Sequence, residues 1–424
     1  MEIKSPRGTK DILPEEVGLY QEIERFARLV FTIYGYREIR TPLFEETHLF
    51  SRSLGKSSEI VRKQMFSVVS QGDKSLSLRP EATAPIIRAF LEHNLDKKAS
   101  FNKFYYIGPM FRAERPQKGR LRQFHHIGCE ALGSSSPYLD VEVISLCINI
   151  LQGLEIKDFK LFINNLGCRG DIKRFSHELK QKLENKLSHL CTMCKDRLKH
   201  NPLRILDCKN KTCIQIVKDS CPDIEYLCSA CQDKFDKVKE ALALLNIKYV
   251  IAANLVRGLD YYTGTVFEIT HPNLGAQDAI AAGGRYDNLA GEFKKVDVPA
   301  VGFAIGFERL ILSLDNNKRD KISKPDNIDV YIASIGQEGY NKGFVILDQL
   351  RKQGMTSEID YESKSLKSQM RTADKLKVRF VAVIGEEELA NNTVTLKDMQ
   401  KGSQNKVSLE NFYKIINQEL QKIK

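Results

Sequence analysis

A basic hairpin is the feature that most limits what this chain can fold into. Two apolar runs, Phe104–Phe111 and Phe124–Leu132, flank a polar connection that contains Pro116 and Gly119. Apolar runs of strand length around such a connection predict two antiparallel strands joined by a long loop. Arginines interleave with the apolar residues, so we expect the cations on one face of the hairpin and at its mouth.

The hairpin carries an unusual amount of positive charge. From Lys103 to Arg122 there are six Lys or Arg residues against one acid, Glu114. A guanidinium offers a fork of donors that suits phosphate and carboxylate oxygens, and an aromatic neighbour can cover a base. Residue types alone leave a solvated basic hairpin as an equally good interpretation.

The order of the residues favours a functional interpretation. The stretch PMFRAERPQKGRLRQFHHIGCE, residues 109–130, resembles motif 2 of the class II aminoacyl-tRNA synthetases, in the form found in histidyl-tRNA synthetases. The resemblance implies that Arg112 bridges the α-phosphate of ATP and the carboxylate of the substrate. It also implies that Glu114 and Arg120 contact ATP and that Phe124 stacks on adenine.

The stretch LRPEATAPIIRAF, residues 78–90, also resembles this family. The resemblance implies that Glu81 and Thr83 hold the ammonium group of the substrate. Ala82 stands where the family usually has glycine, so the local backbone has less freedom. From the residue types alone, Glu81 and Thr83 equally suit the start of a helix, which they would cap.

Residues 255–264, LVRGLDYYTG, resemble the histidine-specific signature of the family, and residues 282–287, AGGRYD, match a further block. Without the resemblance, the first stretch would be an ordinary core strand with Arg257 as a surface cation. With it, Arg257 approaches the phosphate opposite Arg112. The resemblance assigns these residues to the histidine substrate: Glu81, Ala82, Thr83, His126, Glu130, Arg257, Tyr261, Tyr262 and Tyr286.

Two more stretches complete the resemblance. Residues 299–314, PAVGFAIGFERLILSL, are similar to motif 3, whose arginine, here Arg309, holds the outer phosphates of ATP. The alternative is a buried strand–helix junction with an incidental arginine. Residues 41–45, TPLFE, resemble motif 1, which builds the dimer interface, so the resemblance implies a homodimer.

His126 departs from the family pattern, which usually has glutamine there. A neutral imidazole nitrogen can accept a hydrogen bond from the ammonium group of the substrate. A protonated ring would repel that group. An unperturbed ring therefore predicts that activity falls below about pH 6.5.

The ten cysteines suggest a metal site. The start of the chain does not resemble a signal peptide and no apolar run is long enough to span a membrane, so we expect a cytoplasmic protein with reduced thiols. The pairs Cys191/Cys194 and Cys228/Cys231 have CxxC spacing and are expected to converge on one structural Zn²⁺ ion. Free thiols in a helical insertion are an equally good interpretation.

Apolar spacing predicts the outline of the secondary structure. Expected helices include residues 22–34, 44–54 and 138–153, with strands over residues 36–43 and 159–164. A short hairpin is expected over residues 64–69 and 75–78, with its turn at Gln71–Asp73. In the last hundred residues, strands at 330–335, 380–384 and 394–396 alternate with helical patterns at 340–352, 363–375 and 409–422.

The resemblance implies an α+β fold. A class II synthetase catalytic domain, built on an antiparallel sheet with helices, would comprise residues 1–167 and 247–317. A helical, cysteine-rich insertion would cover residues 168–246. After a polar linker at 315–327, residues 328–424 would form an α/β anticodon-binding domain of the class IIa type.

The function that the resemblance implies is that of a histidine–tRNA ligase, which would activate L-histidine with ATP and Mg²⁺ and charge tRNA(His). The formal net charge of +11 agrees with an anionic partner. One alternative is a non-catalytic paralogue such as the regulatory subunit of ATP phosphoribosyltransferase, which typically loses signature residues and the C-terminal module. A zinc-bearing RNA-binding protein would leave residues 255–264 unexplained.

Overall fold

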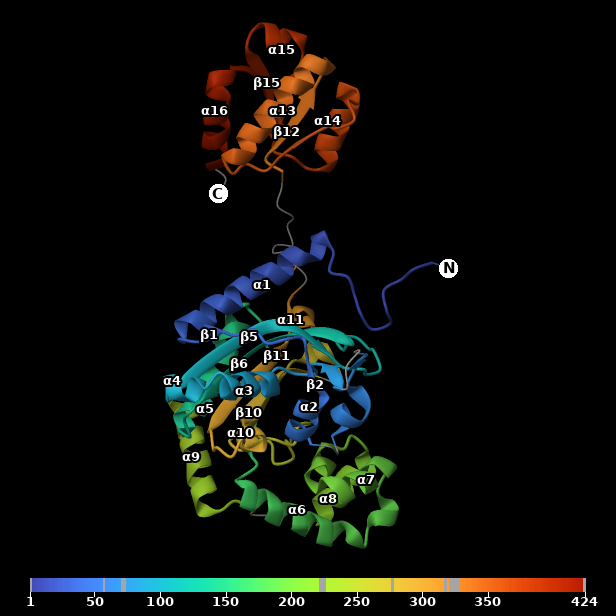
Figure 1. Ribbon diagram of the computed structural model, residues 1–424, viewed down its shortest axis with the longest axis vertical. Helices are drawn as coiled ribbons and strands as arrows, with labels where there is room; N and C mark the ends of the chain where they lie inside the picture. The colour runs from blue at the N-terminus through green and yellow to red at the C-terminus, as the bar shows by residue number, and fades with distance from the viewer. Residues whose placement is uncertain are drawn as a thin grey trace. The chain divides into compact units, whose positions relative to one another are not determined.

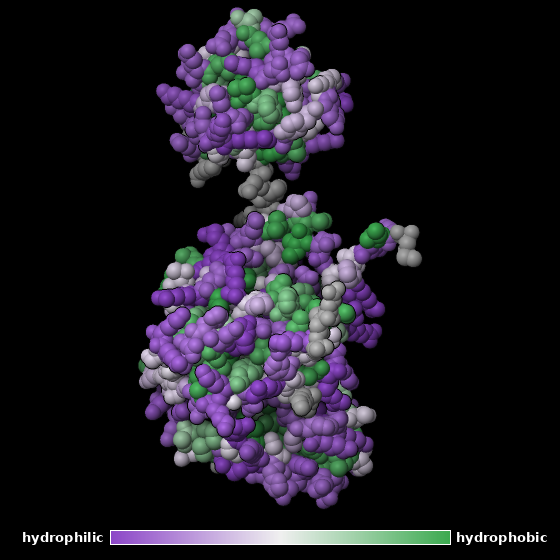
Figure 2. Space-filling view, in the orientation of Figure 1, coloured by the Kyte–Doolittle hydropathy of each residue, from purple (hydrophilic) through white to green (hydrophobic). Residues whose placement is uncertain are grey.

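The computed structural model describes residues 2–55, 58–69, 74–220, 226–275, 278–315, 319 and 328–421. The chain divides into two compact units, residues 1–322 and 323–424 (Figure 1). Hydrophilic side chains cover most of the visible face of each unit, with apolar side chains between them (Figure 2). Among the described residues, no helix has the length and apolar character needed to cross a membrane.

An eight-stranded sheet forms the centre of the first unit. Its order is β1-β5-β6-β11-β10-β9-β7-β8. The six inner strands are antiparallel, as the resemblance implies, and each two-residue edge strand adds a parallel pair. The bounds are β1 Arg37–Glu38, β5 Asn102–Phe111, β6 Gln123–Leu132, β7 Lys160–Asn165, β8 Val250–Ile251, β9 Thr263–Thr270, β10 Ala279–Arg285 and β11 Ala300–Gly306.

The basic hairpin is confirmed as β5 and β6. These strands pair in register from Asn102 opposite Leu132 to Phe111 opposite Gln123. Along β5, Tyr106, Gly108 and Met110 are buried in alternation, and a one-residue slip would turn their side of the strand to the opposite face, which fixes the register. The hairpin loop, residues 112–122, is therefore held at one end of the sheet.

Helices cover the sheet of the first unit. Helix α5 follows the predicted bounds closely, while α1 begins earlier than expected, since Pro14 occupies a first-turn position that proline favours. Gly35, with φ +77°, ends α1 in the left-handed conformation that glycine adopts easily. The bounds are α1 Pro14–Ile33, α3 Thr83–Glu92, α4 Leu95–Lys98, α5 Pro137–Gly153, α10 Leu289–Phe293 and α11 Phe307–Ser313.

The expectation for residues 36–54 is partly wrong. The strand shrinks to Arg37–Glu38, and the stretch expected as one helix starts as strand β2, Phe44–Glu46, before helix α2, Thr47–Ser53. Strand β2 pairs with β4, Leu76–Leu78, so pairing with a distant segment overrides the local helical pattern.

Strand β4 also completes the short hairpin predicted from the sequence. It pairs antiparallel with β3, Ser67–Val68, after a single π-helical turn, η1, at Ile60–Gln64. The strands are shorter than expected. The turn expected at residues 71–73 lies outside the described residues.

The described residues between 169 and 244 lie mostly in helices, as the sequence predicts for the insertion. Helices α6, α7 and α8 gather at the end of the unit opposite α1, whereas α9 lies beside α5 (Figure 1). The apolar residues of these helices belong to different cores. Phe175, Leu179 and Leu183 of α6 pack with α7 and α8, whereas the apolar stripe of α9, which is Phe235, Val238 and Leu242, joins the main core of the first unit. The bounds are α6 Arg169–Glu184, η2 Leu187–His189, α7 Thr192–His200, η3 Pro202–Asp207, α8 Lys211–Ser220 and α9 Ser229–Leu244.

The second unit is an α/β module with a five-stranded sheet in the order β13-β12-β14-β15-β16. The predicted strands and helices are present with small changes in their ends. Both edge strands were missed, because β13 is short and β16 is polar and exposed. The bounds are β12 Val330–Ser334, α13 Gly336–Lys352, β13 Ser357–Ile359, α14 Leu366–Lys375, β14 Phe380–Ile384, α15 Glu386–Ala390, β15 Thr393–Asp398, β16 Gln404–Ser408 and α16 Leu409–Gln421.

Candidate active site

A cavity of about 230 Å³ opens at the hairpin end of the first unit. Its walls come from the hairpin, the start of α3, the segment before β9, and the β11–α11 junction. The residues proposed from the sequence that line it are Glu81, Thr83, Arg112, Glu114, Arg120, Phe124, His126, Glu130, Arg257, Tyr261, Tyr262, Tyr286 and Arg309. Ala82 is buried behind the wall, in a small core beneath α3.

Arg112 projects from the end of β5 and is held by neutral groups. Its Nε donates to the carbonyl oxygen of Pro80 at 2.9 Å, and its guanidinium lies over the ring of Phe124, 5.3 Å from the centroid. Burial lowers the pKa of this guanidinium, although the carboxylate of Glu81 opposes the shift. The cation is therefore partly desolvated and fixed in direction before any anion binds.

Arg309 lies in the first turn of α11 and contacts the hairpin loop and the start of β10. Its Nε donates to the carbonyl oxygen of Gly119 at 3.1 Å, and a terminal nitrogen donates to that of Ala279 at 2.7 Å. Gly119 has φ +71°, so a residue with a side chain would be strained at this turn. The glycine thus lets the hairpin loop bring its carbonyl to the arginine.

Arg257 lies in the segment before β9 and pairs with an acid from that strand. A terminal nitrogen donates to Glu268 Oε2 at 2.6 Å. Its Nε is buried and has no hydrogen-bond partner within the described part of the chain. A buried donor without a partner is costly, and a ligand oxygen would satisfy it.

Glu130, near the end of β6, lines another part of the cavity wall. It accepts hydrogen bonds from the Thr83 hydroxyl, at 2.6 Å, and from the Tyr286 hydroxyl. The residue is 1% exposed, and burial raises the pKa of its carboxyl group to about 8. Gly302 lies beside it on β11, where a Cβ atom would stand 1.9 Å from Glu130 Oε2, so only glycine fits.

Glu81 does cap helix α3, as the simpler interpretation holds. Its carboxylate accepts from the backbone N–H groups of Thr83, at 2.6 Å, and Ala84, at 3.1 Å. The residue also lines the cavity, and burial raises the pKa of its carboxyl group. Capping and a place in the cavity wall are therefore compatible.

Tyr261 and Tyr262 both line the cavity. An extended chain would point them to opposite faces, but they precede strand β9, which begins at Thr263. Their ring centroids lie 4.7 Å apart, and Tyr261 also meets Tyr286 edge to face. The turn before the strand makes this aromatic wall.

His126 stands in the cavity wall with its Nδ1 buried. That nitrogen has no hydrogen-bond partner among the described residues. Burial, followed by the nearby cations of Arg112 and Arg309, lowers the pKa of the ring well below its ordinary value. The ring is therefore neutral near pH 6.5, and the expected loss of activity there, which assumed an unperturbed ring, does not follow.

Sequence reasoning missed three cavity-side residues. Tyr106 and Glu308 line the cavity, and Glu268 pairs with Arg257. Glu308 accepts from the backbone N–H of His125 at 3.0 Å and contacts its ring Nδ1 at 2.9 Å, which ties α11 to β6. A single acid inside the apolar run of β9 was the available signal for Glu268.

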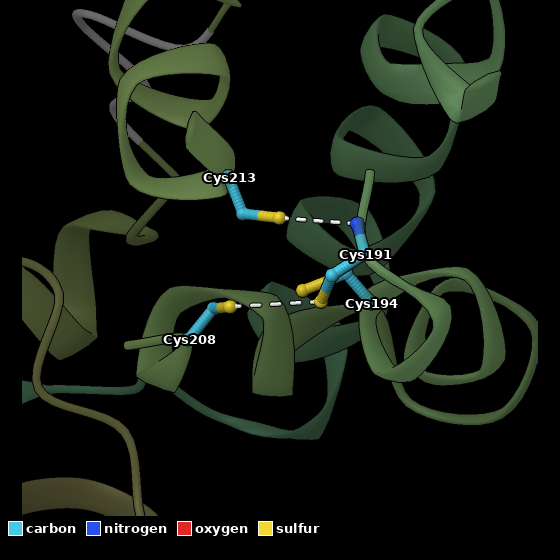
Figure 3. Close-up of side chains that lie close together, drawn as sticks. All are labelled: Cys191, Cys194, Cys208 and Cys213. Carbon is cyan, nitrogen blue, oxygen red and sulfur yellow. Dashed lines mark hydrogen bonds between the residues drawn. The ribbon is translucent and has the colours of Figure 1, made fainter. Parts of the chain in front are cut away.

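The prediction that the two CxxC pairs converge on one zinc ion is wrong. The two pairs lie in different clusters, one of Cys191, Cys194, Cys208 and Cys213 (Figure 3), the other of Cys168, Asp171, Cys228 and Cys231. The first pair opens α7, within the α6–α8 helices, whereas the second opens α9, beside the start of α6. Cys221 lies outside the described residues.

Comparison with known proteins gives a consistent result. Residues 8–310 match the family model for histidyl-tRNA synthetase, and residues 329–419 match an anticodon binding domain. A histidine–tRNA ligase of Halothermothrix orenii is 48% identical over 423 residues, covering 100% of both chains.

Solved structures agree. The apo histidyl-tRNA synthetase of S. aureus has a TM-score of 0.80 at 34% identity, covering 98% of this chain and 100% of that one. A Bacillus halodurans protein titled ATP phosphoribosyltransferase regulatory subunit/histidyl-tRNA synthetase has a TM-score of 0.65 at 23% identity, over 91% of this chain and 98% of its own. The latter likeness shows the fold alone.

Proposed function

The chain belongs to the histidyl-tRNA synthetase family and is an aminoacyl-tRNA ligase for histidine, and we propose that the cavity described above is where it activates the amino acid. One observation carries this proposal. Arg112, Arg257 and Arg309 come from distant parts of the chain and line one cavity, which also contains buried carboxyl groups. A solvated basic hairpin would not gather these groups.

The first step joins two anions. The carboxylate of histidine attacks the α-phosphorus of ATP, the bond to the bridging oxygen of pyrophosphate breaks, and histidyl-adenylate forms. Negative charge builds on the phosphorus oxygens, so fixed cations lower the barrier most. Arg112 and Arg257 would stabilise this charge, and neither forms a covalent intermediate, since positioning and electrostatics suffice.

The ATP side of the cavity is the arginine-rich one. Arg309 would hold the outer phosphates, Arg120 and Glu114 would contact the nucleotide, and Phe124 would stack on adenine. Carboxylate oxygens are ligands that Mg²⁺ takes beside nucleotide phosphates, and the cavity offers those of Glu114 and Glu308. These residues would hold the ion, which neutralises phosphate charge when bound.

The histidine side is the carboxylate side. Glu130 and Tyr262 would recognise the imidazole ring, and Glu81 and Thr83 would face the ammonium group. An incoming cation or N–H donor favours the ionised form of a buried carboxyl group. Because burial raises the pKa of Glu130 to about 8, histidine binding at neutral pH would release a proton from it.

The second step transfers the histidyl group to the 3′ end of tRNA(His). We propose that residues 1–167 and 247–317 form the catalytic domain and that residues 168–246 are an insertion within it. We assign anticodon binding to residues 328–424, which the match at residues 329–419 supports. We place the protein in the cytoplasm as a homodimer. Leu43 and Phe44, in the stretch that resembles motif 1, are 43% and 52% exposed, which suits an interface.

ATP–pyrophosphate exchange with each amino acid in turn tests the proposal. Exchange should require histidine, and Arg257→Ala should reduce it strongly while the protein remains folded. If none of the amino acids supports exchange, the result would instead favour the non-catalytic paralogue. Full exchange in Arg257→Ala would remove that residue from the mechanism but leave the activity itself intact.

A further inference from the structure

We propose that the four-cysteine cluster, defined as Cys191, Cys194, Cys208 and Cys213, binds one Zn²⁺ ion that supports the histidine-binding loop, residues 255–262. The four sulfur atoms all lie within 4.8 Å of one another, and three of the four residues are buried (Figure 3). They come from three separate segments: the start of α7, the residue after η3, and the first turn of α8.

The spacing of the sulfurs suits a shared ion. Zinc–sulfur bonds of about 2.3 Å in a tetrahedron place the sulfurs about 3.8 Å apart. The sulfurs of Cys191 and Cys208 are 4.0 Å apart, close to that edge length. Four cysteine sulfurs that can surround one ion as a tetrahedron favour Zn²⁺, which binds at such sites and has no redox chemistry.

Two backbone N–H groups are directed at sulfur atoms of the cluster. The backbone N–H of Cys191 donates to Cys213 Sγ at 3.3 Å, and that of Asn210 donates to Cys208 Sγ at 3.4 Å. Donors aimed at sulfur stabilise its charged form and orient metal ligands. Cys191 and Cys194 also stand at the start of α7, where the helix dipole favours negative charge.

The helices that carry the cluster are short. Helix α7 has 9 residues, η3 has 6 and α8 has 10. Helices shorter than about 12 residues are marginal in water unless tertiary contacts hold them. A structural metal supplies those contacts in small units whose apolar core is limited.

The second part of the inference links this cluster to the histidine-binding loop, and it rests on the proposed function. Cys208 shares an apolar core with Ile205 of η3 and with Val256, the neighbour of Arg257. Just before η3, Asn201 Nδ2 donates to Asp260 Oδ1 at 2.8 Å. An ion that fixes the end of η3 would therefore fix the backbone that carries Arg257 and Tyr262.

Metal content tests the first part on the full-length protein purified under reducing conditions. Cys208→Ser should contain one zinc ion fewer per chain than the parent, and the parent loaded with Co²⁺ should show the absorption of a tetrahedral thiolate site, which the variant lacks. Cys168→Ser is the matched control, because this exposed cysteine belongs to the other cluster and serine suits its N-cap position. Cys168→Ser should keep the cobalt absorption.

Three results would overturn the zinc assignment. They are equal zinc content in Cys208→Ser and the parent, iron in place of zinc, and a disulfide within the cluster of the purified protein. A further ion that only Cys168→Ser loses would belong to the other cluster, and the loss in Cys208→Ser would still support the assignment.

Kinetics test the second part. The parent stripped of metal by a chelator should show a KM for histidine raised several-fold in pyrophosphate exchange, with the KM for ATP little changed. Added Zn²⁺ should return the KM for histidine to its original value in the parent but not in Cys208→Ser. An unchanged KM for histidine in stripped protein would overturn the support of the loop, while the metal measurement would still stand. Absence of exchange in zinc-loaded parent would count against the proposed function instead.

Discussion

The two sides of the cavity hold their charges in different ways. Arg112 and Arg309 are positioned by main-chain carbonyl oxygens, which leave a permanent positive charge directed into the cavity. Glu130 is positioned by two hydroxyl groups, and burial raises the pKa of its carboxyl group to about 8. One side therefore has a charge fixed at all ordinary pH values, and the other has a charge that depends on pH and on the ligand.

This difference matches the chemistry of the two substrates. A triphosphate is an anion throughout the physiological range, so a permanent cation always attracts it. An amino acid must enter with its ammonium group near acids that are costly to bury in ionised form. Glu130 reduces that cost by staying protonated until the substrate supplies a partner. The predictions below test each half of the comparison.

The largest effect should come from the fixed cation. Arg112→Ala should lower the rate of histidine-dependent pyrophosphate exchange by about 10²–10³-fold, as removal of one preorganised donor to a transition-state oxyanion does. Arg112→Lys should recover part of the rate, because it keeps the charge but loses the fork of donors. The measurement is kcat for exchange at saturating histidine and ATP.

Arg115→Ala provides the matched control for this prediction. Arg115 lies three positions along the same hairpin loop, and its side chain is exposed. Exchange by Arg115→Ala should equal that of the parent. A loss equal to that of Arg112→Ala would mean that the general charge of the hairpin matters, and the difference between fixed and solvated cations would disappear.

A smaller effect is expected on the carboxylate side. Glu130→Gln keeps the shape of the side chain and an oxygen that accepts hydrogen bonds, but it cannot carry charge. Hydrogen bonds to charged groups are worth about 1.5–3 kcal/mol, so the KM for histidine should rise about tenfold to hundredfold. The KM for ATP should change little. Equal increases in both constants would contradict the division of the cavity into two sides.

Glu130 should also make stability depend on pH. Its folded pKa of about 8 lies above the ordinary value of a glutamate, so between the two values the folded state binds the proton and the unfolded state does not. Its contribution to stability is therefore complete at low pH and is lost as the pH rises toward 8.

Denaturant titrations of ligand-free protein at pH 5 and pH 9 measure this effect. The free energy of unfolding of Glu130→Gln, relative to the parent, should increase with pH, by up to several kcal/mol because each pKa unit corresponds to about 1.4 kcal/mol. The remaining titratable groups are the same in both proteins and largely cancel. A difference that stays constant from pH 5 to pH 9 would mean that Glu130 is ionised in the folded state.

Local sequence patterns predicted those parts of the fold that have strong local signals. The β5–β6 hairpin and helix α5 have long apolar runs with clear turn or cap residues, and their bounds differ little from the prediction. Strand β2 was missed because its residues pair with β4 some thirty positions away, which no local pattern reveals. The parallel edge pairs depend on distant contacts in the same way.

The residues of the cavity also divide into those that the sequence could identify and those that depend on distant contacts. Arginines and glutamates in the matched motifs could be named from the sequence, since motif order implies their roles. Gly302 could not, because its importance comes from the position of Glu130 on the neighbouring strand. The predicted zinc site was wrong for a related reason. CxxC spacing identifies two possible ligands that lie together, but the path of the chain decides which pairs of cysteines meet.

The smallest effect should come from His126→Gln, which restores the residue usual in the family. Burial and the cations of Arg112 and Arg309 lower the pKa of the His126 ring well below its ordinary value, so the ring is neutral from pH 6.5 to pH 8. The ratio of kcat/KM for histidine between parent and variant should therefore stay constant, within about twofold, over this range.

The ratio is the informative quantity because substrate histidine and Glu130 titrate within the same range and affect both proteins equally. A ratio that falls as the pH drops toward 6.5 would mean that the ring becomes protonated there and repels the ammonium group. In that case the positive charge of Arg112 and Arg309 would not keep the neighbouring His126 ring neutral. The two sides of the cavity would be electrostatically independent, contrary to the coupling that the arginines beside His126 predict.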